Sequence, residues 1–173
     1  MKKISQFIQL LFIFIFAQCY PAPKAAGQFT EQEFEDMATQ MAKGTVKDIT
    51  TQTLKLEQEN IVLLDTRERK EYEISHIPGA IWVGYDDFKI KRLEYIPKDA
   101  KVVTYCSVGY RSERIGEQLQ RAGYQDVHNL KGSIFKWINE GNTVVDKAGN
   151  PTEKIHGYNE KWGKWVKKGR VVY

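Results

Sequence analysis

The sequence predicts an α/β fold in which a central, mainly parallel β-sheet has helices on both faces. Short apolar runs alternate along the chain with segments of helical periodicity, which is the pattern of parallel strands joined by crossover helices. One of these runs, residues 61–65 (IVLLD), is continuously apolar, as is typical of a strand that is buried on both faces of a sheet. The length of 173 residues is sufficient for one such domain with a hydrophobic core.

The charge of the chain gives little indication of a nucleic-acid partner. The 26 Lys and Arg residues exceed the 22 Asp and Glu residues by a formal net charge of only +4. The sequence has no basic stripe with interleaved aromatic residues, which is the pattern expected of a nucleic-acid-binding surface. We therefore expect small molecules rather than DNA or RNA as partners.

The first 19 residues are predicted to form a signal peptide. Lys2 and Lys3 form a short positive region, and an apolar run follows at residues 7–17 (FIQLLFIFIFA). This run is shorter than the about 20 residues that a membrane-spanning helix requires. We therefore expect an exported protein, periplasmic or extracellular, whose formal net charge falls from +4 to +2 when both lysines are removed with the peptide.

The end of this peptide contains the first of the two cysteines of the chain. Ala17 and Cys19 are small residues two positions apart, so we expect cleavage after Cys19. Two alternatives remain open, an uncleaved anchor and a lipid anchor on Cys19, although Gln18 is larger than the residue that usually precedes a lipidated cysteine. Either anchor would bring the protein into weak contact with a membrane.

A linker and a helix are predicted next. Residues 20–28 (YPAPKAAGQ) are rich in Pro and Ala and are typical of a linker. Residues 29–44 are predicted to form a helix that packs in front of the domain, with Thr30 and Glu33 in a capping box and Gly44 at its end. The apolar residues of a hydrophobic staple and of one helical face are Phe29, Phe34, Met37, Ala38 and Met41.

Strands and helices are predicted to alternate in the central part of the chain. The strands are expected at residues 45–49, 61–65, 80–83, 101–106 and 126–130. A helix is expected at residues 112–123, where Ser112 would cap the start and Gly123 would end it. Its inward positions are Ile115, Leu119 and Ala122. A shorter helix is expected at residues 133–141 (SIFKWINEG).

Residues 142–173 form a C-terminal extension of different composition. Residues 146–151 (DKAGNP) are predicted to form a turn. Apolar residues then follow at helical spacing with lysines on the opposite face, namely Tyr158, Trp162, Trp165 and Val166 against Lys161, Lys164 and Lys168. This pattern predicts an amphipathic helix that packs on the domain, and the alternative is a helix on a membrane surface.

The second cysteine lies in the stretch YCSVGYRS, residues 105–112. Cys106 ends a predicted strand and Ser112 begins a predicted helix, so the loop between them lies at a helix N-terminus. Free N–H groups and the helix dipole favour an anion there, and Arg111 adds a positive charge. Gly109 allows the backbone to turn its N–H groups inward. These features lower the pKa of a thiol and predict a reactive thiolate, whereas the alternative for a lone cysteine is a small, buried apolar residue.

Two stretches resemble the signatures of one known family, the rhodanese-like sulfurtransferases. CSVGYRS, residues 106–112, is similar to the active-site loop of the family, which has Gly three positions and Arg five positions after the cysteine. DTRERKEYEISHIPGAIWV, residues 65–83, is similar to its second signature, with Asp-x-Arg, then Glu and an aromatic residue, then His-Ile-Pro-Gly-Ala. The resemblance covers residues 52–141 and implies the rhodanese-like three-layer fold.

The resemblance implies a transferase of the thiosulfate sulfurtransferase type that works through a persulfide. Cys106 would take a sulfane sulfur from thiosulfate, a persulfide or a polysulfide, and would pass it to cyanide or a thiol. The residues of the loop that would bind the donor are Ser107, Val108, Gly109, Tyr110, Arg111 and Ser112. No metal or organic cofactor is implied for this chemistry.

The second signature is expected to supply supporting residues. Asp65 would hold Arg67 or the cysteine loop by hydrogen bonds. His76 would fix the turn into the next strand. Glu71 and Tyr72 are expected to face the loop region or the core without a chemical role. No metal-ligand spacing relates the three histidines of the chain.

Two other functions remain open. Phosphatases and arsenate reductases of a related kind have five residues between Cys and Arg, whereas four residues separate Cys106 from Arg111 here. The shorter loop favours a single sulfur over a tetrahedral phosphate. The other alternative is a rhodanese-like module that binds a partner or senses oxidants, and turnover with thiosulfate would discriminate against it.

Overall fold

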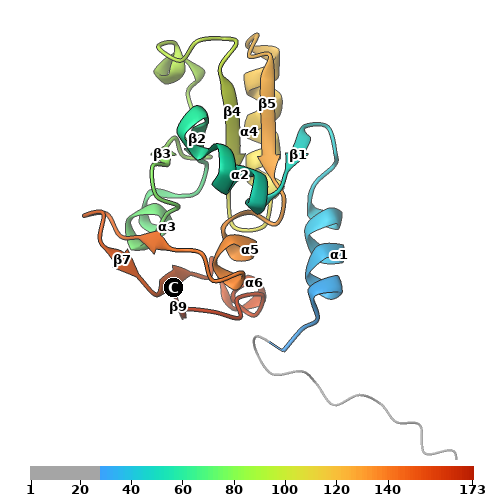
Figure 1. The fold of residues 1–173 in the computed structure, drawn as a ribbon, viewed down its shortest axis with the longest axis vertical. Helices are drawn as coiled ribbons and strands as arrows, with labels where there is room; N and C mark the ends of the chain where they lie inside the picture. Colours follow the sequence, from blue (N-terminus) through green and yellow to red (C-terminus); the bar gives the residue numbers. More distant parts are fainter. Residues whose placement is uncertain (1–27) are drawn as a thin grey trace, which may run out of the picture.

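The structure is a computed structural model that describes residues 28–173 (Figure 1). The predicted signal peptide, residues 1–19, lies outside the described residues. The same holds for the predicted linker, residues 20–28, apart from its last residue.

A five-stranded sheet lies at the centre of the molecule, and each strand is parallel to its neighbours. The order of the strands across the sheet is β1-β5-β4-β2-β3. The strands are β1 (Lys47–Ile49), β2 (Val62–Asp65), β3 (Ile81–Trp82), β4 (Lys101–Tyr105) and β5 (Asp126–Leu130). Each strand lies within a predicted run, so the predicted parallel α/β sheet is confirmed.

Helices cover both faces of this sheet, which confirms the three-layer arrangement (Figure 1). The helices are α1 (Glu31–Met41), α2 (Thr51–Glu57), α3 (Arg69–Ile74), α4 (Tyr110–Arg121), α5 (Ser133–Asn139) and α6 (Glu160–Gly163), with the 3₁₀ turns η1 (Gln58–Asn60) and η2 (Ile90–Leu93). Successive strand residues point to opposite faces of the sheet and enter two hydrophobic clusters. The first cluster contains Leu63 and Val103 with residues of α1, α2 and α5, and the second contains the neighbouring Leu64 and Val102 with residues of α4.

Helix α1 begins as predicted. The Thr30 hydroxyl accepts the N–H of Glu33 at 3.1 Å, and the Glu33 carboxylate accepts the N–H of Thr30 at 2.7 Å, which completes the capping box. The hydrophobic staple is also present, because the ring centres of Phe29 and Phe34 lie 5.8 Å apart. Local side-chain chemistry therefore determines this helix start.

The end of α1 differs from the prediction. The helix ends at Met41, and Gly44 lies in the following loop. The carboxylate of Glu113 on α4 accepts the N–H groups of Lys43 and Thr45, the latter at 2.9 Å. These N–H groups are satisfied by a distant acid rather than by helical carbonyls, so the chain leaves the helix before the glycine.

Helix α4 begins before the predicted cap. Its N-cap is Gly109, whose φ of +119° is left-handed, and its first helical residue is Tyr110. Ser112 therefore lies in the first turn, where its hydroxyl donates to Asn129 Oδ1 at 2.7 Å. The prediction that Ser112 caps the helix is wrong, because the left-handed glycine already turns the chain into the helix. The predicted end is confirmed, with Gly123 just after the helix at a φ of +89°.

The C-terminal extension, residues 142–173, does not form the predicted amphipathic helix. Its elements are a hairpin of β6 (Val144–Val145) and β7 (Pro151–Thr152) around the predicted turn, a parallel pair of β8 (Lys154–His156) and β9 (Arg170–Val172), and the single turn α6. Helix α6 ends at Gly163, and the chain later returns past this glycine, where a Cβ atom would lie only 2.4 Å from the hydroxyl of Tyr173. This close return takes the place of a continuous helix.

Three of the four predicted apolar residues of the extension pack on the domain, whereas Tyr158 is 48% exposed. Val166 is buried in the first cluster, and Trp162 and Trp165 pack against that cluster. The ring centres of Phe29 and Trp165 lie 5.1 Å apart, so the extension also contacts the N-terminal helix segment. Figure 1 shows the extension, orange to red, beside α5. Within residues 28–173, no helix has the length and apolar character that crossing a membrane requires.

Candidate active site

The cysteine loop joins the end of β4 to the start of α4, and α5 holds it from behind. Cys106 follows β4 directly and is 2% exposed. The Ser133 hydroxyl accepts the N–H of Cys106 at 3.1 Å. The N–H groups of Ile134 and Phe135 donate to the carbonyls of Cys106 and Ser107, both at 3.2 Å. The start of α5 therefore positions the backbone of the loop.

The sulfur of Cys106 lies in surroundings that favour a thiolate. The N–H of Gly109 donates to the sulfur at 3.2 Å. Burial raises the pKa of the Cys106 thiol, but Arg111 and the N–H groups of Ser112 and Gly109 outweigh burial, so that the pKa lies below its ordinary value. Position 109 requires glycine, because a φ of +119° is rarely adopted by residues with a side chain. The N–H groups of Gly109 and Ser112 and the positive charge of Arg111 thus all stabilise the negative form of the sulfur.

Glu71 on α3 holds Arg111 beside the loop. The fully buried carboxylate accepts from Arg111 Nη1 at 2.7 Å and from Nη2 at 2.8 Å. The Ser107 hydroxyl lies between them, because it accepts from Arg111 Nη2 at 3.1 Å and donates to Glu71 at 3.3 Å. Burial raises the pKa of the Glu71 carboxyl, but Arg111 outweighs burial, so the pKa is lowered. The acid is therefore a charged and fixed partner for the arginine.

Two residues of this arrangement, Glu71 and Ser133, are absent from the site that the sequence predicts. The sequence pattern places Glu71 on a helix near the loop, and the spacing of Glu68 and Glu71 indicates only a helix start. Ser133 only begins a predicted helix. The partner of Glu71 is 40 positions away in the sequence, so no local pattern identifies the contact.

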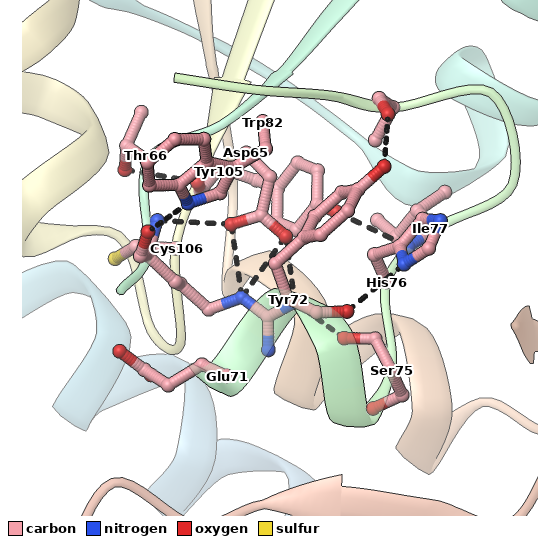
Figure 2. Close-up of polar contacts among 12 residues, drawn as sticks. Asp65, Thr66, Glu71, Tyr72, Ser75, His76, Ile77, Trp82, Tyr105 and Cys106 are labelled. Carbon is pink, nitrogen blue, oxygen red and sulfur yellow. Dashed lines mark hydrogen bonds and ion pairs between the residues drawn. The ribbon is translucent and has the colours of Figure 1, made fainter. Parts of the chain in front are cut away.

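Asp65 and Arg67 form a fully buried ion pair. Figure 2 shows Asp65 beside Tyr105, the residue that precedes Cys106. Arg67 Nη2 lies 2.6 Å from the Asp65 carboxylate, and it also donates to the Ser75 carbonyl at 2.6 Å. Burial lowers the pKa of Arg67, but Asp65 outweighs burial, so the guanidinium stays charged. Asp65 thus holds Arg67, as expected, and the link to the loop runs through Thr66, whose N–H donates to the Tyr105 carbonyl at 2.9 Å.

The histidines near the site have structural partners. The ring of His76 stacks on Tyr72 with a centroid distance of 3.8 Å, and its Nδ1 lies 3.0 Å from the Tyr72 carbonyl. His156 Nδ1 accepts the N–H of Tyr158 at 2.9 Å. In the part of the chain that the structure describes, no group of three or more His, Cys, Asp or Glu side chains could hold a metal ion.

A cavity of about 400 Å³ opens over Cys106. The loop contributes its base through Cys106, Ser107, Val108, Tyr110 and Arg111. The walls come from other parts of the chain and consist of Met41, Glu68, Tyr85, Asp86, Tyr158 and Trp162. The remaining predicted loop residues, Gly109 and Ser112, bond to the sulfur without lining the cavity. The cavity is therefore built from the cysteine loop together with the N-terminal helix and the C-terminal extension.

This arrangement suits nucleophilic attack by sulfur. A thiolate lies at the base of a cavity, and its negative charge is balanced by an arginine and by backbone N–H groups. Since these groups are already in place, the sulfur needs no general base to become reactive.

Comparison with known proteins places the cysteine loop in a recognised domain. A family model described as Rhodanese-like domain matches residues 50–140. The tRNA uridine(34) hydroxylase of Bacillus cereus (strain Q1) is 34% identical over 87 residues, which are 47% of this chain and 27% of that protein. The enzyme of the same name from Onion yellows phytoplasma is 31% identical over 87 residues, 47% of this chain and 28% of that protein. The chain thus spans less than a third of the length of these curated relatives.

Solved structures share the fold. The Rhodanese-like Domain Protein from Staphylococcus aureus is 28% identical with a TM-score of 0.51, and the match covers 58% of this chain and 98% of that chain. The thiosulfate sulfurtransferase from Pseudomonas aeruginosa is 22% identical with a TM-score of 0.54, and the match covers 68% of this chain and 23% of that chain. The second likeness shows the fold alone. Met41, Tyr158 and Trp162 of the cavity lie outside the family match.

Proposed function

Since this chain belongs to the rhodanese-like domain family, we propose that it is a sulfurtransferase in which Cys106 carries the transferred sulfur. One observation carries the proposal. The sulfur of Cys106 lies at the base of a cavity, accepts the N–H of Gly109 at 3.2 Å, and has a pKa below its ordinary value. A sulfur that ionises readily is the nucleophile that the transfer requires.

The transfer has two halves. In the first, the Cys106 thiolate attacks the outer sulfur of thiosulfate, of a persulfide or of a polysulfide. A new S–S bond forms, the S–S bond of the donor breaks, and the leaving group, sulfite in the case of thiosulfate, keeps the electron pair. In the second, cyanide or a thiolate attacks the outer sulfur of the persulfide, and Cys106 leaves as a thiolate. The N–H of Gly109 is placed to stabilise the negative sulfur in both halves.

The geometry favours sulfur transfer over phosphoryl or arsenate chemistry. Both terminal nitrogens of Arg111 donate to Glu71, at 2.7 and 2.8 Å. The second N–H of Nη2 donates to the Ser107 hydroxyl at 3.1 Å, so Nη2 has no N–H group left for the bidentate grip on two phosphate oxygens. A single sulfur requires only the charge of Arg111 and the N–H groups of the loop.

A tRNA substrate, which the names of the curated relatives state for those proteins, is not part of this proposal. The match covers only 27% and 28% of the two relatives described above. The cavity of about 400 Å³ over Cys106 has the size of a small-molecule site.

Mass spectrometry of the protein after incubation with thiosulfate tests the proposal. We expect Cys106 to gain the mass of one sulfur atom, and to lose it again when cyanide is added and thiocyanate forms. The Cys106→Ser protein should gain no sulfur, because a serine hydroxyl stays un-ionised near neutral pH. Oxidation of Cys106 without turnover of any sulfur donor would overturn the proposal and would support the redox-sensing alternative.

A further inference from the structure

The cavity over Cys106 has an acidic wall. Glu68 and Asp86 line it, and among residues 28–173 the one basic lining residue is Arg111. Glu68 is half-buried at the start of α3, and Asp86 is exposed after β3. Burial raises the pKa of the Glu68 carboxyl, and the negative charge of Asp86 raises it further. An additional negative charge near Glu68 is therefore unfavourable.

The charge of Arg111 is already balanced before a substrate enters. Its two terminal nitrogens bond to Glu71, which is fully buried behind it. The positive charge of the same guanidinium also lowers the pKa of Cys106, so it stabilises a second anion, the thiolate. A small dianion that entered the cavity would find no cation that is free to pair with it among the lining residues.

The rest of the wall is apolar and aromatic. It consists of Met41, Tyr85, Tyr110, Tyr158 and Trp162. The guanidinium of Arg114 lies 5.5 Å from the ring centre of Tyr110, and the ammonium of Lys161 lies 5.5 Å from that of Trp162. Neither of these cations lines the cavity. Such a wall offers contact area to an organic group, and its polar atoms are neutral hydroxyl and indole groups that bring no positive charge to a second anionic centre.

The aromatic part of the extension is held in place by its own backbone. Tyr158 has a left-handed φ of +63°, its N–H donates to His156 Nδ1 at 2.9 Å, and its ring centre lies 5.0 Å from the guanidinium carbon of Arg111. The N–H of Trp162 donates to Asn159 Oδ1 at 3.2 Å, and the ring packs against the first cluster. This part of the wall is thus preformed over the cysteine loop.

We infer that the cavity selects an organic sulfur donor that carries an apolar or aromatic group and at most one negative charge, and that it discriminates against thiosulfate, a dianion. The organic group would contact Tyr158 and Trp162. A second negative charge would face Glu68 and Asp86. The inference rests on the proposed function, because it names the donor class for the persulfide of Cys106.

Benzenethiosulfonate is a suitable probe, because it has the reacting S–S bond of thiosulfate but carries a phenyl ring in place of one oxyanion. The Cys106 thiolate attacks its outer sulfur and forms a new S–S bond. The bond between the outer sulfur and the sulfonyl sulfur breaks, and benzenesulfinate leaves with the electron pair. One thiolate and one donor anion give one persulfide anion and one sulfinate anion, so that no oxidant or reductant is consumed.

The experiment compares kcat/KM for benzenethiosulfonate and for thiosulfate, with cyanide as the common acceptor. In a ping-pong reaction, kcat/KM for the donor reports only the first half of the transfer. The ratio of the two values is divided by the ratio of the rates at which a small thiol, mercaptoethanol, reacts with the same donors. We expect a normalised ratio of about 10 or more, and a value of one or below would overturn the inference.

Two substitutions separate charge from contact area. Glu68→Gln removes one negative charge and keeps the size of the side chain, so it should raise kcat/KM for thiosulfate about fivefold and that for benzenethiosulfonate less than about twofold. Trp162→Ala should lower kcat/KM for benzenethiosulfonate about 10-fold with little effect on thiosulfate, and Trp162→Phe should restore most of the loss. Glu94→Gln is the matched control, because Glu94 is exposed and does not line the cavity.

The outcomes distinguish the inference from the proposed function. If both donors respond alike to Glu68→Gln and to Trp162→Ala, the wall does not select the donor, and the inference fails while sulfur transfer stands. If neither donor yields a persulfide on Cys106 in a protein that circular dichroism shows to be folded, the proposed function fails and the inference fails with it. Should Trp162→Ala not fold, the normalised ratio of the unmodified protein and the response to Glu68→Gln still decide.

Discussion

At the scale of single residues, the guanidinium of Arg111 interacts with two anions, the Glu71 carboxylate and the Cys106 thiolate. Burial lowers the pKa of Arg111, but the hydrogen bonds and charge of Glu71 and the charge of Cys106 outweigh burial, so the pKa is raised and Arg111 is a cation. Glu71 sets its position through two hydrogen bonds, at 2.7 and 2.8 Å. The electrostatic state of the cysteine therefore depends on an acid that does not touch the sulfur.

Replacing Arg111 by Gln should raise the pKa of the Cys106 thiol towards the ordinary value of about 8.5, because the largest influence that lowers it is lost. The rate of alkylation by iodoacetamide follows the thiolate fraction, so its midpoint should move to higher pH. Sulfur transfer near neutral pH should fall about 10-fold and should recover as the pH rises. Arg114→Gln is the control, and an unchanged midpoint in Arg111→Gln would contradict the assignment.

The buried ion pair of Asp65 and Arg67 is expected to contribute to the stability of the fold. Asp65→Asn would leave the guanidinium of Arg67 buried without its counter-ion, and we expect the free energy of unfolding to fall by about 3–5 kcal/mol. Urea unfolding measures this change without screening the charges.

The exposed pair of Arg69 and Glu73, 2.9 Å apart, is the matched control for this measurement. Glu73→Gln removes a carboxylate from an ion pair that remains in contact with water, so the midpoint of urea unfolding should hardly move. Similar small effects of Asp65→Asn and Glu73→Gln would show that the buried pair does not support the fold.

At the scale of elements, the start of α4 couples a backbone conformation to the chemistry. Gly109 precedes the helix with a φ of +119°, and Gly123 follows it with a φ of +89°. A Cβ atom would find room at both positions, because one added at position 109 would lie 3.5 Å from Asn129 Nδ2 and one at position 123 would have no heavy atom of another side chain or segment within 4 Å. At both positions the left-handed φ favours glycine over a residue with a side chain. Only the N–H of Gly109 donates to the sulfur of Cys106.

Gly109→Ala and Gly123→Ala should each lower the free energy of unfolding by about 1–2 kcal/mol, because a left-handed φ strains a residue with a side chain. Only Gly109→Ala should also lower sulfur transfer, since it shifts the N–H that donates to Cys106. Urea unfolding and the rate with cyanide, measured on both proteins, check this. Equal losses of activity in the two proteins would attribute the effect to stability alone.

At the scale of the whole molecule, the site is completed by two segments that lie outside the family match. The segment around α1 and the extension contact each other, because the ring of Trp165 lies 5.1 Å from that of Phe29 and 6.2 Å from that of Phe34. The same two segments contribute Met41 and Trp162 to the cavity over the cysteine. The rhodanese-like domain therefore contains Cys106, and segments on both sides of it in the sequence form part of the cavity over that residue.

We also propose that the whole protein is exported and loses residues 1–19, on the basis of the sequence pattern of that segment. N-terminal sequencing of protein from the native host should then find Tyr20 as the first residue, outside the cytoplasm. A lipid on Cys19 would support the anchored alternative instead. Met1 on cytoplasmic protein would contradict export.

The sequence by itself determined those features whose signals are local. A strand that is buried on both faces needs a continuous apolar run, so residues 61–65 identify β2 without any partner. The capping box of Thr30 and Glu33 lies within one turn, and it predicts the start of α1. The surroundings of Cys106 were predictable for the same reason, because Gly109, Arg111 and the helix start all follow within a few residues.

Only the tertiary structure decided which distant groups meet. Glu71 bonds to Arg111, which lies 40 positions away in the sequence, and Glu113 on α4 accepts an N–H from the loop that follows α1. No local sequence pattern identifies the partner of either acid. In the C-terminal extension, likewise, the sequence pattern predicted packing on the domain but not the fold of the backbone. Helical spacing indicates that Trp162, Trp165 and Val166 pack on the domain. In the structure Val166 is buried and both tryptophans are partly buried, although the helix there, α6, has only a single turn. An apolar pattern in the sequence predicts that a side chain is removed from water. The contacts of the folded chain determine which residues it packs against.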